Sequence, residues 1–148
     1  GAKLEHPVEL RDFLPTFIEL AGGLVPPDMD GKSLLKLVQG QDNEWRKYLD
    51  MEHATCYSPD NYWRALTDGK IKYIWNFHTG KEELFDLRKD PKELVECSGK
   101  RTYAALLKEM RQAMVDHLAE RGETFVKDGK LVVREKTMLY SPNYPQKK

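Results

Sequence analysis

Three β-rich segments separated by short turns occupy the middle of the sequence and restrict the fold more than any other feature. Residues 62–67 and 70–77 are rich in aromatic and β-branched side chains, and 83–87 forms a third such run. The Asp68-Gly69 pair between the first two runs predicts a hairpin with a type I′ turn. Along 71–76 the side chains alternate between apolar and mixed, as on the two faces of one strand. The sequence therefore predicts an antiparallel meander.

A long amphipathic helix is expected over residues 102–121, capped by Thr102 and stopped by Gly122. Its apolar side chains recur at spacings of three and four: Tyr103, Leu106, Leu107, Met110, Met114 and Leu118. Such a stripe fits across one face of a sheet. With a further strand at 48–53, the predicted fold class is α+β. It comprises a small antiparallel sheet of about four strands, one long helix packed on it, and short helices before it.

The segment before the strands predicts the first of these short helices, over residues 10–22. Asp12 suits its N-cap, and Gly22 suits the position after its end. Its buried face is expected to consist of Phe13, Phe17, Leu20 and Ala21. The expected organisation is a linker-like helical segment at 1–47, a subdomain at 48–133 and an extended tail at 134–148.

Composition excludes several classes of protein. Lysine and arginine total 24 and aspartate and glutamate total 24, a balance that argues against nucleic acid as a partner. The sequence has no run of the ~18–20 apolar residues that a membrane-spanning helix needs. Cys56 and Cys97 match neither a CxxC motif nor a zinc pattern. A disulfide between them requires an oxidising compartment, and two unpaired thiols are the favoured alternative.

No complete catalytic constellation stands out in the sequence, and no metal-binding pattern is found. The best candidate site is the Glu52-His53 pair, which ends the predicted strand 48–53 and precedes a loop. The alternative is an ordinary strand-end glutamate beside a histidine that is hydrogen-bonded to a neighbour. His78 lies in a turn and is expected to be solvated, and His117 is expected to be a partly buried helix residue.

Five short motifs, in the same order and with similar spacing, resemble the sulfatase family of the alkaline-phosphatase superfamily. They are Asp12-Phe13-Leu14-Pro15-Thr16 with Glu19-Leu20-Ala21-Gly22, Pro26-Pro27 with Asp30-Gly31-Lys32-Ser33-Leu34, Arg46 with Glu52-His53, Lys72-Tyr73-Ile74-Trp75, and Glu83-Leu84-Phe85-Asp86-Leu87 with Asp90-Pro91 and Glu93. The resemblance covers about residues 6–120. It implies the C-terminal portion of an arylsulfatase-like enzyme, a sulfuric ester hydrolase whose catalytic centre lies in an N-terminal domain absent from this chain.

In that family a Cys or Ser in C/S-x-P-x-R becomes formylglycine, and calcium assists the reaction. Cys56 is followed by Tyr57-Ser58-Pro59, so this motif is missing here and no catalytic residue or metal ligand carries over. The resemblance implies formylglycine and calcium only for the intact enzyme. It also implies that Glu52 and His53 border the substrate pocket there.

The implied partners are the N-terminal catalytic domain and a sulfated small molecule or glycan, with no nucleic acid and no membrane. Self-association through an uncovered apolar face is a further expectation. The family implies a periplasmic or secreted parent protein. The alternatives are the same region of a related phosphodiesterase or phosphonate hydrolase, and an independent binding module.

Overall fold

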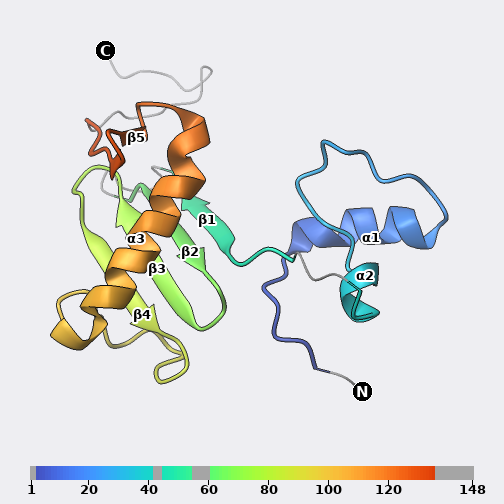
Figure 1. Ribbon diagram of the computed structural model, residues 1–148, viewed down its shortest axis with the longest axis horizontal. Helices are drawn as coiled ribbons and strands as arrows, with labels where there is room; N and C mark the ends of the chain where they lie inside the picture. Colours follow the sequence, from blue (N-terminus) through green and yellow to red (C-terminus); the bar gives the residue numbers. More distant parts are fainter. Residues whose placement is uncertain (1–2, 42–44, 55–60, 136–148) are drawn as a thin grey trace, which may run out of the picture. The chain divides into compact units, whose positions relative to one another are not determined.

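A computed structural model describes residues 3–41, 45–54 and 61–135 (Figure 1). The chain forms two compact units. The first unit comprises residues 1–49 and the turn 67–69, and the second unit comprises the remaining residues.

Cys56 and nearly all of the predicted tail lie outside the described residues. Cys97 is buried as a free thiol. Among the described helices, none is both long enough and apolar enough to cross a membrane.

The second unit is built on a four-stranded sheet with the order β1-β2-β3-β4 (Figure 1). The strands are β1 (Leu49–His53), β2 (Trp63–Thr67), β3 (Ile71–Asn76) and β4 (Glu82–Asp86). β3 and β4 are antiparallel, with Ile71 opposite Asp86 and Trp75 opposite Glu82. Burial alternates strictly along β3, as the sequence predicts. The predicted small antiparallel sheet of an α+β fold is confirmed.

The turns at Asp68-Gly69 and Asp128-Gly129 differ in conformation. Gly69 has a φ of 82°, whereas Asp68 is outside the left-handed region. The predicted type I′ turn is therefore wrong there, because that turn needs positive φ at both central residues. At Asp128 and Gly129 both φ angles are positive, 49° and 69°, as a type I′ turn requires. That turn joins the short strands β5 (Val126–Lys127) and β6 (Lys130–Leu131).

The helix α3 (Ala104–Leu118) lies across one face of the sheet and is extended by a single 3-10 turn at each end (Figure 1). Met110, Met114 and Leu118 are fully buried, so the predicted apolar stripe forms the core between helix and sheet. Thr102 is not the cap, because it lies inside the 3-10 turn Arg101–Tyr103 and the N-cap residue is Tyr103.

The first unit is organised around the buried carboxylate of Asp12 in the 3-10 turn Leu10–Asp12. Its oxygens accept hydrogen bonds from the backbone N–H groups of Glu9 and Lys32, both at 2.9 Å, and from the Arg46 guanidinium at 2.5 and 2.7 Å. Burial alone would raise the pKa of Asp12, but these donors lower it below its ordinary value. The predicted side-chain cap on α1 (Phe13–Leu20) is therefore wrong, because this carboxylate has other partners.

Two further motif residues hold the same unit together. The Thr16 hydroxyl donates to the Asp12 carbonyl at 2.5 Å and accepts from the Leu34 N–H at 2.9 Å, just before α2 (Leu35–Val38). A Cβ at Gly31 would lie 2.0 Å from the Arg11 carbonyl oxygen, so only glycine fits there. The first two motifs of the sequence analysis thus have a structural role, since their residues connect α1 to the segment that follows it.

The predicted buried face of α1 is wrong. Phe13, Phe17 and Leu20 are 46%, 61% and 63% exposed, and Ala21 is exposed too, whereas Pro15 and Thr16 on the other side are buried. The helix buries the side that faces the Asp12 cluster. Its large apolar side chains remain uncovered, with Phe13 and Phe17 stacked at 6.1 Å between ring centroids.

Candidate functional site

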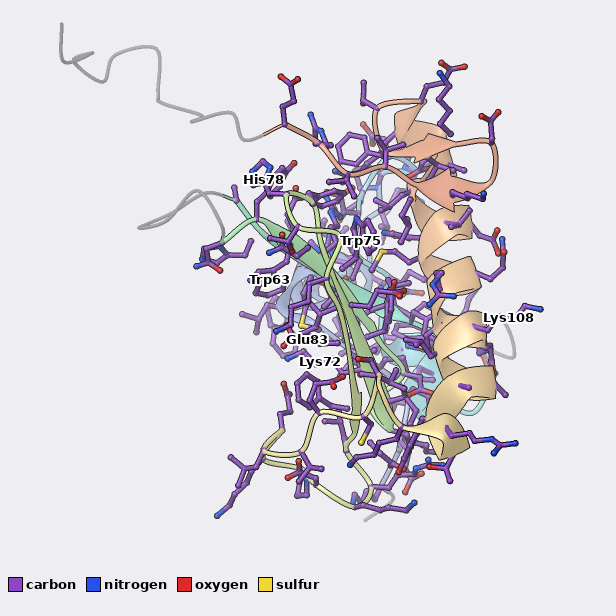
Figure 2. All side chains as sticks on the ribbon, turned by 90° about the vertical axis from the view of Figure 1, so that its left-hand side faces the viewer. Trp63, Lys72, Trp75, His78, Glu83 and Lys108 are labelled. Atoms are coloured by element: carbon purple, nitrogen blue, oxygen red, sulfur yellow. The ribbon has the colours of Figure 1, made fainter. Side chains whose placement is uncertain are left out.

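The predicted site residues Glu52 and His53 end β1, and their side chains lie on opposite faces of the sheet. Successive residues of a strand point to opposite sides. Glu52 forms ion pairs with Arg64 and with Arg121, the latter in the 3-10 turn that extends α3. His53 stacks on Trp63, which Figure 2 shows on the side of the sheet away from α3. The structure therefore separates the two residues into different environments.

On the face away from α3, His53 and Trp63 form a compact aromatic pair. Their ring centroids are 5.6 Å apart and their planes differ by 18°. Both rings are anchored by Asn61: the His53 Nδ1 lies 2.8 Å from the Asn61 carbonyl oxygen, and the Trp63 Nε1 donates to the Asn61 Oδ1 at 3.1 Å. A carbonyl oxygen only accepts, so the Nδ1 carries a proton. In the neutral ring the Nε2 is then a hydrogen-bond acceptor.

The charged side chains on the same face are paired with each other. The Lys72 Nζ lies 2.7 Å from the Glu93 carboxylate, and the Lys81 Nζ lies 2.8 Å from the Glu83 carboxylate. Figure 2 shows Lys72 and Glu83 beside Trp63 on this side of the sheet. A fixed imidazole beside a flat indole can hydrogen-bond a hydroxyl or an anionic oxygen and pack against an apolar ring face.

On the face toward α3, the buried side chain of Arg64 is the centre of an ionic cluster. Its side chain is 1% exposed, and its guanidinium donates to Asp50 at 2.9 Å and to Glu52. Burial lowers the pKa of Arg64, while the carboxylate of Glu52 acts in the opposite direction. The His117 Nε2 lies 3.6 Å from Asp50, and His117 is partly buried, as predicted. This cluster fixes the end of β1 that carries His53.

Arg64 was not predicted from the sequence as part of the site. Asp50 and Glu52 are two residues apart in one strand, so they share a face, and that spacing is a signal for a basic partner. The partner could not be chosen without the register of β1 on β2. His78 also differs from its prediction: it is buried rather than solvated, with its Nδ1 3.1 Å from the Arg134 carbonyl oxygen.

Within residues 3–41, 45–54 and 61–135, no group of three or more His, Cys, Asp or Glu side chains is placed to hold a metal ion. Most aromatic side chains of the central strands are core residues, as the sequence favoured, including Tyr62, Tyr73, Trp75 and Phe77. Trp63 is the half-buried exception.

Comparison with known proteins relates most of this chain to the sulfatase family. Residues 1–120 match the family described as N-sulphoglucosamine sulphohydrolase, C-terminal. An arylsulfatase from Clostridium perfringens is 30% identical over 132 residues, which is 89% of this chain and 27% of that enzyme.

Two solved structures resemble the fold of this chain. One is a complex with the substrate D-glucosamine-2-N,6-O-disulfate; it has a TM-score of 0.64 and 26% identity, and covers 74% of this chain and 23% of that one. The other, a 2-O glycosaminoglycan sulfatase, has a TM-score of 0.65 and 29% identity, and covers 74% and 24%. The chain thus spans about a quarter of the length of these relatives.

Proposed function

Because the chain belongs to the N-sulphoglucosamine sulphohydrolase C-terminal family and is a C-terminal sulfatase domain, we propose that it lines part of the substrate pocket in a sulfate-ester hydrolase. The observation that carries this proposal is the His53–Trp63 pair, held by Asn61 on the sheet face away from α3. The indole packs against the substrate, and the His53 Nε2 hydrogen-bonds it. Glu52 acts indirectly, because its ion pair with Arg64 fixes the end of β1.

The catalytic centre of the proposed enzyme belongs to an N-terminal domain outside this chain. Formylglycine and calcium are assigned to that domain, since Cys56 lacks the C-x-P-x-R context. The exposed apolar face of α1, formed by Phe13, Leu14, Phe17 and Leu20, is the surface proposed to pack against it. In this proposal the chain has a structural role and does not hydrolyse sulfate esters alone.

A sulfated glycan is the proposed substrate class. The support is the relative seen with D-glucosamine-2-N,6-O-disulfate and the relative described as a glycosaminoglycan sulfatase. A periplasmic or secreted location of the parent protein is part of the same proposal. Cell fractionation tests it, and recovery of the parent protein in the cytosol would contradict it.

The test of the pocket role is a matched pair of histidine variants in the full-length protein. His53→Ala is expected to lower kcat/KM on a sulfated glucosamine by about tenfold or more, equivalent to ~1.4 kcal/mol of transition-state stabilisation. His6→Ala is the control, because His6 is exposed and lies in the first unit, outside the cluster that positions β1. Equal kcat/KM values for His53→Ala and the unsubstituted enzyme would refute the pocket role.

A further inference from the structure

A groove of about 340 Å³ lies between α3 and the β5–β6 hairpin, on the sheet face opposite His53 and Trp63. Its volume falls in the range of small-molecule sites, about 300–1,000 Å³. Three separate parts of the second unit line it, and the side chains that matter here are Trp75, Lys108, Arg111, Val115, Lys130 and Leu131. The walls are therefore held by helix, sheet and hairpin together.

The inner part of the groove is apolar. Trp75 is 8% exposed and Val115 is buried, while Leu131 is half-buried. The indole N–H of Trp75 is buried and makes no hydrogen bond within the described part of the chain. Since that N–H is buried, the indole offers a ligand in the groove its apolar ring surface.

The outer part of the groove is positively charged. Lys108 and Lys130 are exposed, and neither ammonium group pairs with a carboxylate among the described residues. Figure 2 shows Lys108 extending from the helix into solvent. Arg111 already has a carboxylate partner, because its guanidinium donates to Glu82 at 2.6 and 2.7 Å. The two lysines thus remain to bind an anion.

We propose that this groove binds a sulfated sugar unit. The apolar ring face of the sugar packs on Trp75, Val115 and Leu131, and its sulfate is held by Lys108 and Lys130. An uncharged ligand would give the two ammonium groups no anionic partner, and a bare anion would make no contact with the apolar walls. The choice of a sulfated sugar over other organic anions rests on the proposed function.

The test is an NMR titration of the 148-residue chain with D-glucosamine-2-N,6-O-disulfate. The indole N–H resonances report each tryptophan separately, and Trp75→Phe assigns the one in the groove. A saturable shift of the Trp75 resonance is expected. Unsulfated glucosamine and inorganic sulfate are the comparison ligands, and each is expected to produce a much smaller shift at the same concentration.

A double variant, Lys108→Gln with Lys130→Gln, is expected to raise the Kd by about tenfold, because it removes two charge-assisted contacts. Lys127→Gln is the control, since Lys127 is on the same hairpin, opposite Lys130, and does not line the groove. An unmoved Trp75 resonance, or equal Kd values in the double variant and the unsubstituted chain, would overturn the proposal. An equal response to inorganic sulfate would overturn the sugar assignment. The Trp63 resonance reports the proposed pocket wall independently, so the two proposals fail separately.

Discussion

Asp12 shows how a single residue can be recognised from the sequence while its role is misassigned. The sequence places it at a helix start, where a carboxylate caps free N–H groups. In the structure the same carboxylate binds Lys32 and Arg46, which are 20 and 34 residues away. Both partners lie in motifs that the sequence analysis noted separately. Local spacing identified the residues, but only the fold brings them into contact.

Removing the Asp12 charge is therefore expected to destabilise the first unit strongly. Asp12→Asn leaves the guanidinium of Arg46, which is largely buried, without its main partner, and loss of one member of a buried ion pair lowers the free energy of unfolding by about 3–5 kcal/mol. Urea unfolding followed by Trp45 fluorescence measures this, since Trp45 donates to the Pro7 carbonyl in the same unit. Asp28→Asn, at an exposed position, is the control and should change it by less than about 0.5 kcal/mol. A small effect of Asp12→Asn would contradict this account.

The position of Glu52 and His53 at the end of a strand was predictable from the sequence, but the directions and partners of their side chains were not. Glu52 and His53 stand out because they end a strand before a loop, and the structure confirms that β1 ends at His53. Strand alternation already implies that neighbouring residues point to opposite faces. The sequence does not show which face of the sheet α3 covers. Nor does it show that Trp63 contacts His53 and that Arg64 contacts Glu52, because both contacts depend on the pairing of β1 with β2. Sequence spacing within one segment does not contain that information.

At the scale of elements, α3 was predicted well because its apolar stripe is covered within the chain. Met110, Met114 and Leu118 recur at helical spacing and are buried against the sheet. The same reasoning failed for α1, whose periodic apolar face is uncovered here. Periodicity shows that a helix has an apolar face, but not where the surface that covers it comes from.

Truncation of the α3 core is expected to destabilise the second unit. Met114→Ala removes a fully buried side chain, and such changes lower the free energy of unfolding by about 2–5 kcal/mol. Gln112→Ala, on the exposed side of the same helix, is the matched control and should stay within about 0.5 kcal/mol. Chemical denaturation of both variants measures the difference. Similar midpoints for the two would show that α3 does not pack as described.

The exposed face of α1 is expected to make the isolated chain self-associate. Phe17 and Leu20 are both more than half exposed, and large apolar patches drive association. Sedimentation velocity should show oligomers that increase with concentration. Phe17→Ser with Leu20→Ser should shift the chain to a monomer, while Leu24→Ser, a loop substitution at a 95% exposed residue, should have a smaller effect. A strictly monomeric unsubstituted chain would contradict the docking role of this face.

For the whole molecule, stability is expected to fall at acidic pH through buried carboxylates. Hydrogen bonds from Arg88 hold the pKa of Asp86 well below its ordinary value; burial opposes this, and the Tyr103 hydroxyl adds to it. A carboxylate whose pKa is lowered by folding stabilises the protein above its unfolded pKa of about 3.9, and this contribution is lost as the pH falls toward the lower folded value.

The measurement is the free energy of unfolding as a function of pH, from neutral pH to well below the ordinary pKa of aspartate. Asp86→Asn should be less stable than the unsubstituted chain at neutral pH, and its stability should fall less steeply in the acid range. Asp90→Asn is a nearby comparison, because Asp90 follows β4 and its carboxylate accepts an exposed hydrogen bond from the Val95 N–H. Parallel pH curves for Asp86→Asn and the unsubstituted chain would contradict the assignment.

The most direct test of the central claim is the rate of sulfate release from D-glucosamine-2-N,6-O-disulfate, measured with calcium for the full-length protein and for residues 1–148 alone. The account predicts turnover by the full-length protein, none by the chain alone, and a loss of about tenfold in kcat/KM for Trp63→Ala in the full-length protein. Turnover by the chain alone would contradict it. So would a full-length protein that cleaves phosphate diesters or phosphonate monoesters but no sulfate ester.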